Sequence, residues 1–194
     1  EVLDFWLGDG IEQEWPTQDL SNRWFGGGAG LDAEIRARFG ADVTTAVAGG
    51  LREWENPPLT RLALVILLDQ FTRNVFRGKA QAFAGDARAQ QLVLRTIAAG
   101  EDLQLPWAGR VFLYMPLMHA ENLALQDECV ASFTRLVADA PESLKIRLQD
   151  NLNFARKHRD IIERFGRFPH RNAVLGRETT PEEQAFLDEG GFSG

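Results

Sequence analysis

His119 and His170 are the two residues of this sequence best suited to move a proton at neutral pH. An unperturbed imidazole titrates near neutrality, so either ring could serve as a general acid or base. A carboxylate such as that of Glu121 or Asp69 would orient the ring. With arginines to stabilise developing negative charge, such a set would suit hydrolysis or group transfer on an anionic substrate. No nucleophile that would complete the set is evident.

Arginine suggests a second kind of chemistry, because it is concentrated in two windows of an acidic chain. The chain has 21 basic and 28 acidic residues, a net charge of −7. Residues 73–79 hold three basic residues and no acidic one, and residues 156–177 hold seven basic residues and two acidic ones. A planar guanidinium binds carboxylate or phosphate through two parallel hydrogen bonds, so the windows predict a local cationic site. Alternatively, some of these arginines form helix-surface ion pairs, as Arg156 could with Asp160.

A metal centre is not expected from the ligands that the sequence offers. There are three histidines and one cysteine, and a regular helix would place His119 and Glu121 on nearly opposite sides. We therefore expect no metal and no other cofactor. The Gly-rich stretch 26–30 lacks the Gly-Lys-Ser/Thr of a phosphate loop, and Cys129 aligns with Phe133 as a small core residue rather than a nucleophile.

The composition limits the class of protein in which these residues act. The chain has 194 residues, 44% of them hydrophobic and 25% charged, which is typical of one globular domain. Its negative charge argues against nucleic acid as a partner. The longest apolar run, residues 62–68, is too short to cross a bilayer, so no membrane partner is expected. A single cysteine fits a reducing compartment, and we expect a cytoplasmic protein of unknown oligomeric state.

The elements that position these side chains are predicted to be helices, because the hydrophobic period is helical and no hairpin signal is convincing. The predicted helices are Val2–Leu7, one capped by Asp32 that ends near Val47, Leu59–Phe76, one capped by Asp86 that ends near Gly100, one opened by Pro106 and kinked or split at Pro116, Cys129–Val137, Glu142–Phe165 with Gly166 as its C-cap, and a last short helix capped by Thr180. Short connections predict antiparallel neighbours. The expected fold is all-α, a single-domain antiparallel helical array over residues 1–194 without recognisable sequence repeats.

The predicted helix over residues 59–76 is apolar on nearly all sides, which indicates a central position. Its stripe carries Asp69 and Arg73, which lie four residues apart and can form an ion pair. Two charges on a buried stripe are costly unless they are paired or used. They are therefore either a buried strut between helices or the floor of a site. His158 also lies on an apolar helix face, where a hydrogen-bonded core histidine is the more common outcome.

Several segments of the sequence together resemble one family. These segments are Val2–Trp6, Leu67–Gly78, Ala82–Asp86, Pro116–Glu121 and Arg164–Asn172. They are similar to domain-of-unknown-function family 924, a largely bacterial family, in a match that reaches Phe192. The resemblance implies an all-α fold related to tetratricopeptide-like helical arrays, and it implies no established activity. Ala120 stands where the family has the serine of a His-Ser-Glu motif, which argues against a reaction that needs this hydroxyl.

The polar residues of these segments exceed what core packing requires, and we predict that they converge on one pocket. The candidate catalytic residues are His119, Glu121 and His170, and the candidate ligand-binding residues are Asp69, Arg73, Asn74, Arg77, Arg167, Arg171 and Asn172. The leading hypothesis is a helical binding module whose cationic pocket takes an anionic small molecule or a peptide carboxylate, most tightly near pH 6. The alternatives are an enzyme that uses a histidine, and a structural protein whose polar network fixes the chain reversal at residues 166–172.

Overall fold

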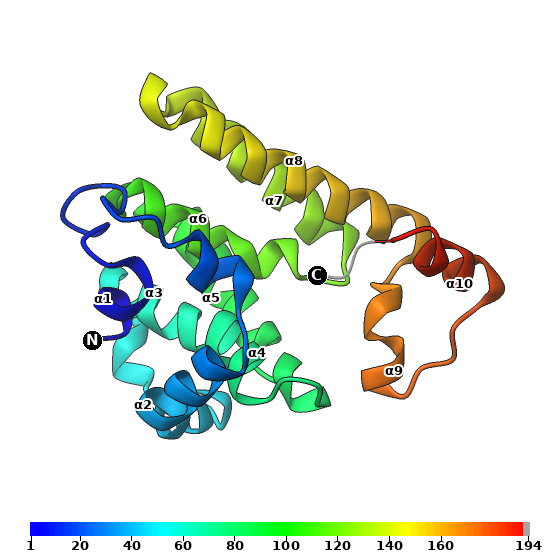
Figure 1. Cartoon of the computed structure of the whole chain (residues 1–194). Helices are drawn as coiled ribbons and strands as arrows, with labels where there is room; N and C mark the ends of the chain where they lie inside the picture. Colours follow the sequence, from blue (N-terminus) through cyan, green and yellow to red (C-terminus); the bar gives the residue numbers. More distant parts are fainter. Residues whose placement is uncertain (192–194) are drawn as a thin grey trace. The chain divides into compact units, whose positions relative to one another are not determined.

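The computed structural model of the chain describes residues 1–191, which form ten α-helices joined by helical turns and loops (Figure 1). The helices are α1 (Val2–Leu7), α2 (Ala29–Val47), α3 (Pro58–Ile66), α4 (Thr72–Val75), α5 (Asp86–Ala98), α6 (Trp107–Met118), α7 (Leu123–Asp139), α8 (Glu142–Phe165), α9 (Asn172–Leu175) and α10 (Pro181–Asp188). No β-strand occurs among the described residues, and the predicted all-α class is confirmed. Phe192, where the family resemblance ends, lies outside them.

The chain divides into two compact units. Unit 1 comprises Glu1–Arg77 and Gln81–Leu117, and unit 2 comprises Gly78–Ala80 and the chain from Met118 onward. Helices α1 to α5 and almost all of α6 belong to unit 1, whereas α7 to α10 belong to unit 2. The single domain that we expected over residues 1–194 stays a prediction.

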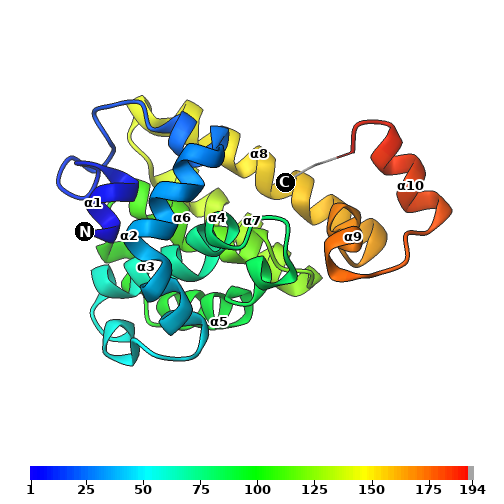
Figure 2. The same ribbon diagram turned by 60° about the horizontal axis from the view of Figure 1, so that its bottom comes forward.

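Aromatic rings at the centre of unit 1 hold its helices together. The ring centroid of Phe39 in α2 lies 5.0 Å from that of Phe71, which lies 5.2 Å from Trp6 in α1. Trp6 also contacts Phe112 of α6 at 5.8 Å. All four side chains are buried, and rings of this size contribute the largest apolar areas to a core. Helix α5 packs against α3 outside this cluster (Figure 2).

The central segment of unit 1 runs from α3 through a π-helical turn, Leu67–Phe71, into α4. The helix predicted over residues 59–76 is therefore present, with one wider turn in its middle. In a π-turn the backbone bonds five residues apart instead of four, so residues four apart no longer lie one above the other. We predicted that Arg73 pairs with Asp69; Arg73 binds Asp86 of α5.

Two aspartates that we predicted as helix N-caps have a different role. Helix α2 begins at Ala29, three residues before Asp32, and α5 begins at Asp86 itself. Both carboxylates lie in the first turn of their helix, where the helix dipole favours negative charge. Both are bound by arginines of the central segment. The capping predictions were wrong because the helices begin earlier than predicted, with Gly28 and Gly85 at the N-cap positions.

Helix α6 continues through Pro116 and ends at Met118, so it is not split at the proline, and a kink there stays a prediction. The side chain of Asn122 then caps α7 by accepting a hydrogen bond from the Leu125 N–H at 3.2 Å. The stretch 119–121 therefore forms the connection between the two helices. The argument that a regular helix would separate His119 from Glu121 does not apply to a connection.

Helices α7 and α8 form an antiparallel hairpin in unit 2, joined by only two residues (Figure 1). Arg159 of α8 binds Asp127 of α7 at 2.6 Å. Gly166, with a φ of 70°, ends α8 as predicted, since glycine adopts the left-handed conformation without a steric penalty. Thr180 and Glu183 form the predicted capping box at the start of α10.

Replacing Gly85 by alanine is expected to destabilise the protein by about 1–3 kcal/mol, the usual cost of overpacking. The added Cβ would collide with the backbone carbonyl of Leu68 in the central segment, which cannot move aside as a side chain could. Gly30→Ala is the matched control, because Gly30 lies in α2 with no atom within 4 Å of its Cβ position. Thermal melts should show a lower midpoint for Gly85→Ala alone, and equal midpoints for the two variants would contradict the close approach.

Candidate functional site

Arg73 is held in unit 1 by a bidentate ion pair with Asp86. Its Nη1 and Nη2 donate to the two carboxylate oxygens at 2.8 and 2.9 Å, and Nη1 also donates to the carbonyl of Ala82. The guanidinium lies 4.6 Å from the centre of the Phe83 ring. The side chains of Arg73 and Asp86 are 24% and 12% exposed. The pair therefore fastens the segment before α5 to the central segment.

Arg77 and Asn74 share one carboxylate, that of Asp32 in α2. Nε and Nη2 of Arg77 donate to Asp32 at 2.5 and 2.8 Å, and Nδ2 of Asn74 donates at 2.8 Å. The hydrogen bonds from Arg77 hold the pKa of the Asp32 carboxyl below its ordinary value. Two residues of the candidate site thus serve to join α2 to the end of the central segment.

Asp69 lies in the π-turn and is fully buried, as predicted. Its carboxylate accepts a hydrogen bond from Nε2 of Gln70 at 2.5 Å. Gln70 also lies 3.8 Å from the sulfur of Met115 in α6. The role of Asp69 as a ligand-binding residue stays a prediction.

Glu121 is the centre of the first polar network in unit 2. Its carboxylate accepts two hydrogen bonds from Arg177, at 2.7 and 2.9 Å, and one from the backbone N–H of Phe168 at 2.8 Å. Arg177 donates further to the Phe168 carbonyl at 3.1 Å and to Oδ1 of Asn172 at 3.0 Å. Burial alone would raise the pKa of Glu121, but the hydrogen bonds from Arg177 and Phe168 outweigh it and lower that pKa. The connection 119–121 is thereby tied to the chain reversal after α8.

Glu183 is the centre of a second network, at the start of α10. Nε and Nη2 of Arg167 donate to its two oxygens at 2.7 and 2.9 Å, and Nδ2 of Asn172 donates at 3.1 Å. The same carboxylate accepts from the Thr180 N–H at 2.8 Å. The hydrogen bonds from Arg167 lower the pKa of Glu183 to about 2. Asn172 therefore links the two carboxylate centres of unit 2.

Three histidines gather around the ring of Phe168 in unit 2. The ring of His158 lies 5.6 Å from Phe168 and 6.2 Å from His119, and the ring of His170 lies 5.7 Å from Phe168. Nδ1 of His158 is 2.7 Å from the carbonyl oxygen of Phe154, which places it as the hydrogen-bonded core histidine that the sequence suggested. The cluster joins the α6–α7 connection, α8 and the reversal after α8.

Burial keeps two of these histidines neutral. Desolvation lowers the pKa of His158 to about 3 and that of His170 to about 4. The charge of Arg171 adds to the shift at His170. A neutral His170 argues against a contribution of this ring to tighter anion binding near pH 6, and that pH dependence stays a prediction.

Arg171 is itself buried in this cluster, with 7% of its surface exposed. Its Nη2 donates to the carbonyl of His119 at 3.0 Å, and its guanidinium lies 4.7 Å from the centre of the Phe168 ring. Arg171 thus binds the connection 119–121 to the chain reversal after α8. Glu121 and Arg177 link the same two segments.

The candidate residues fall into two groups, one in each unit. Unit 1 contains Asp69, Arg73, Asn74 and Arg77, and unit 2 contains His119, Glu121, Arg167, His170, Arg171 and Asn172. The second group is brought together by the two linked networks and the histidine cluster. The convergence of both groups on one pocket stays a prediction.

Carboxylates inside each unit compensate much of the positive charge of the two basic windows. Six of their arginines bind a carboxylate, and four of these form the network pairs Arg73–Asp86, Arg77–Asp32, Arg167–Glu183 and Arg177–Glu121. All four acidic partners lie outside the windows in the sequence. Much of the positive charge that the sequence places in the windows is therefore compensated in the fold.

Four residues that the sequence prediction missed complete these networks: Asp32, Asp86, Arg177 and Glu183. Asp86 gave the clearest signal, since it closes a family segment, and Arg177 lies in the second window. Asp32 and Glu183 were interpreted as helix-start residues, which they also are. Asp32 is 45 residues from Arg77 and Glu183 is 16 residues from Arg167, separations that no local spacing rule detects.

In residues 1–191, no three side chains of His, Cys, Asp or Glu are grouped so that they could hold a metal ion. The expected absence of a metal stays a prediction. Desolvation strongly raises the pKa of the buried Cys129 thiol, which disfavours the thiolate that a nucleophile requires. None of the described helices combines the length and the apolar character needed to cross a membrane.

Glu121→Gln is expected to lower the free energy of unfolding by about 2–3 kcal/mol, because Arg177 would keep its charge without a facing carboxylate. Glu182→Gln is the matched control in the same unit. Glu182 pairs with Arg164 at the surface, where both side chains are at least half exposed, and such pairs contribute roughly 0–1 kcal/mol. Urea titrations compare the two variants, and similar losses would rule out a special role for Glu121.

Acid is expected to destabilise unit 2, because His158 and His170 are neutral when folded and bind protons when unfolded. Their folded pKa values of about 3 and about 4 lie below the unfolded value near 6.5, so stability is constant above pH 7 and falls as the pH drops below 6.5. At pH 5 each ring should cost about 2 kcal/mol. Urea titrations at pH 7.5 and 5.0 measure this loss. His158→Gln should remove about half of it, and an undiminished loss would show that His158 is not its source.

Comparison with known proteins places the chain in a family. The sequence profile of the bacterial proteins of unknown function called DUF924 matches residues 2–191. A solved structure of a protein of unknown function from Agrobacterium tumefaciens is 38% identical, with a TM-score of 0.78, over 93% of this chain and 96% of that one. No curated protein matches the chain. The chain therefore belongs to the DUF924 family, as the five segments that resemble this family indicated.

Proposed function

We propose that the protein is a helical binding module and that unit 2 accepts a compact anion, foremost a carboxylate, in a hollow beside α10. The hollow has a volume of about 570 Å³ and is lined by Arg167, Arg177 and residues 178–181. The observation that carries the proposal is that two guanidinium groups line one hollow. Both are partly exposed, at 29% and 22% of their side-chain surface, so a ligand can reach them.

The two guanidinium groups are fixed before any ligand arrives. Arg167 is held through Nε and Nη2 by Glu183 and by the carbonyl of Glu178, and its Nη1 has no hydrogen-bond partner in the described part of the chain. Arg177 is held by Glu121. Donors that are already ordered lose little entropy on binding, which favours affinity. The hydroxyls of Thr179 and Thr180 add further donors to the lining.

Charge in the hollow favours a singly charged ligand. Glu121 and Glu183 compensate the two arginines, and Glu178 adds a further carboxylate to the lining, so the surroundings offer no net positive charge to a dianion such as phosphate. A carboxylate needs only the donors and one guanidinium face. Because both arginines are partly exposed, added salt should weaken the interaction.

One feature supports the proposed arrangement of the helices. The α7–α8 hairpin is the kind of helix pair that tetratricopeptide-like arrays stack, and we keep that arrangement as part of the proposed fold. The expected cytoplasmic location and the absence of nucleic-acid binding also stay predictions. The enzymatic alternative gains no support from Glu121, because Arg177 and Phe168 engage the carboxylate that would orient a histidine.

A purely structural role is the second candidate, and one observation favours it. Each of Arg73, Arg77, Arg167 and Arg177 already binds a carboxylate within its own unit. In that case the charged residues of the family segments would only hold two stretches of chain in place, the one before α5 and the reversal after α8. No ligand would be needed.

Ligand-dependent stability distinguishes the two candidates. Acetate, N-acetylglycine and inorganic phosphate are titrated at low and high sodium chloride while the thermal midpoint is followed. A ligand at 100 times its dissociation constant adds about 2.7 kcal/mol to the free energy of unfolding. We expect a salt-sensitive rise with the carboxylates that is larger than the rise with phosphate.

Variants locate the effect. Arg167→Gln should abolish the ligand-dependent rise, whatever its own midpoint without ligand. Arg164→Gln is the matched control, since Arg164 pairs with Glu182 and does not line the hollow. If no carboxylate stabilises the wild type more than Arg167→Gln, binding at this hollow is wrong and the structural role stands.

A further inference from the structure

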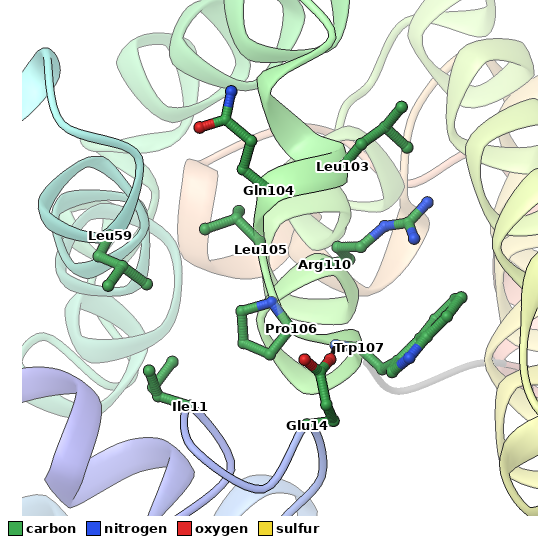
Figure 3. Close-up of a pocket in the computed structure, with 9 residues that line it drawn as sticks. All are labelled: Ile11, Glu14, Leu59, Leu103, Gln104, Leu105, Pro106, Trp107 and Arg110. Carbon is green, nitrogen blue, oxygen red and sulfur yellow. Dashed lines mark hydrogen bonds between the residues drawn. The ribbon is translucent and has the colours of Figure 1, made fainter.

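A second hollow lies within unit 1, at the start of α6, and none of the candidate residues lines it (Figure 3). Its volume is about 410 Å³, within the usual range for small-molecule sites. Six of the nine residues that line it are apolar, among them Leu59, Leu103, Leu105 and Trp107. Glu14 and Arg110 contribute charged groups. Apolar walls with a few polar groups are the general composition of a ligand pocket.

Glu14 belongs to the loop after α1 and binds the N-terminal end of α6. Its carbonyl accepts from the Ala108 N–H at 3.0 Å, and its carboxylate accepts from the Trp107 N–H at 3.3 Å. The residue adopts a φ of 65°, a left-handed conformation that is uncommon for a side chain of this type and is fixed here by the two contacts. The helix dipole and these N–H groups offset the Glu14 charge, so a cation is not needed to balance it.

Arg110 carries the polar chemistry of the hollow. It is 5% exposed, its guanidinium lies 4.9 Å from the centre of the Trp107 ring, and it is hydrogen-bonded to Tyr114. Its Nε is buried and has no hydrogen-bond partner among the residues that the structure describes. Buried donors are nearly always satisfied, so this N–H marks a place for an acceptor. Figure 3 shows Arg110 and Trp107 on one side of the hollow and Leu59 on the other.

The apolar walls favour a ligand with a hydrocarbon body. Leu103 is 65% exposed and Leu59 is 41% exposed, so two large aliphatic side chains of the lining contact water. Covering them removes apolar surface from water and adds favourable free energy with each methylene of the ligand.

We propose that this hollow binds a small amphipathic acid, with its carboxylate at Arg110 and its hydrocarbon chain against Leu59, Leu103 and Leu105. The carboxylate is the acceptor that a guanidinium binds most strongly. The site is separate from the hollow of unit 2 in both position and chemistry, and the proposal does not depend on that one.

The test uses the full chain and three probes of equal length: hexanoate, hexanol and hexylamine. Two-dimensional NMR follows the indole N–H of Trp107, assigned by its loss in Trp107→Phe. We expect hexanoate to shift this resonance at the lowest concentration and hexylamine at the highest. Lengthening the acid from butanoate should tighten binding by up to about fourfold per methylene.

Rim variants separate this site from general adsorption of the probes. Leu103→Ser should weaken hexanoate binding severalfold without harm to folding, because the side chain is mostly exposed. Leu94→Ser is the matched control, an exposed leucine of unit 1 that does not line the hollow. Arg110→Gln should remove the preference for the acid over the alcohol, and Arg164→Gln in unit 2, which lines neither hollow, should change nothing.

Three results would overturn the proposal. The first is an unmoved Trp107 resonance at saturating hexanoate. The second is tighter binding of hexylamine than of hexanoate, which would assign the polar contact to Glu14. The third is equal affinity in Leu103→Ser and Leu94→Ser. If Arg110→Gln fails to fold, the comparison of the two leucine variants still decides.

Discussion

An arginine that packs against helices requires polar partners, foremost a carboxylate, because a charge removed from water without a partner costs several kcal/mol. In this protein that requirement fixes the segments that are not long helices. Asp86 holds the approach to α5, Asp32 holds the end of the central segment, and Glu121 and Glu183 hold the reversal after α8. The helices pack through apolar faces, whereas the segments that connect them are held in place by these ion pairs.

The same requirement explains which parts of the fold the sequence could predict. Gly166 and the Thr180 capping box were predictable because each depends on residues within one turn of a helix. The partner of Glu121 was not, since Arg177 lies 56 residues further along the chain. Asp32 has the residue type and position of a helix cap, so only the folded arrangement shows that it serves Arg77. The sequence could thus predict which residues matter in the family segments, but not which of them meet.

Histidine was the least reliable guide to function in this sequence. His158 and His170 have the right chemistry for proton transfer in water. Burial beside Phe168, however, lowers the pKa of both rings and keeps them neutral at pH values well below 6.5. Desolvation depends on the surroundings of the ring, which a single sequence does not contain. The two hollows also differ in the surroundings of their arginines. Arg167 and Arg177 in unit 2 are partly exposed and paired with carboxylates, whereas Arg110 in unit 1 is buried beside aliphatic side chains.

The π-turn at Leu67–Phe71 lets the central segment carry one residue more than a regular α-helix between the same ends. Deleting one residue from the turn would restore a regular helix and leave the residues that follow in register. Arg73, Asn74 and Arg77 would then still face Asp86 and Asp32. A deletion after the turn would instead rotate the residues that follow it by about 100°. Relatives that keep these two carboxylate contacts should therefore tolerate a one-residue gap between residues 67 and 71, but show none between residues 72 and 77.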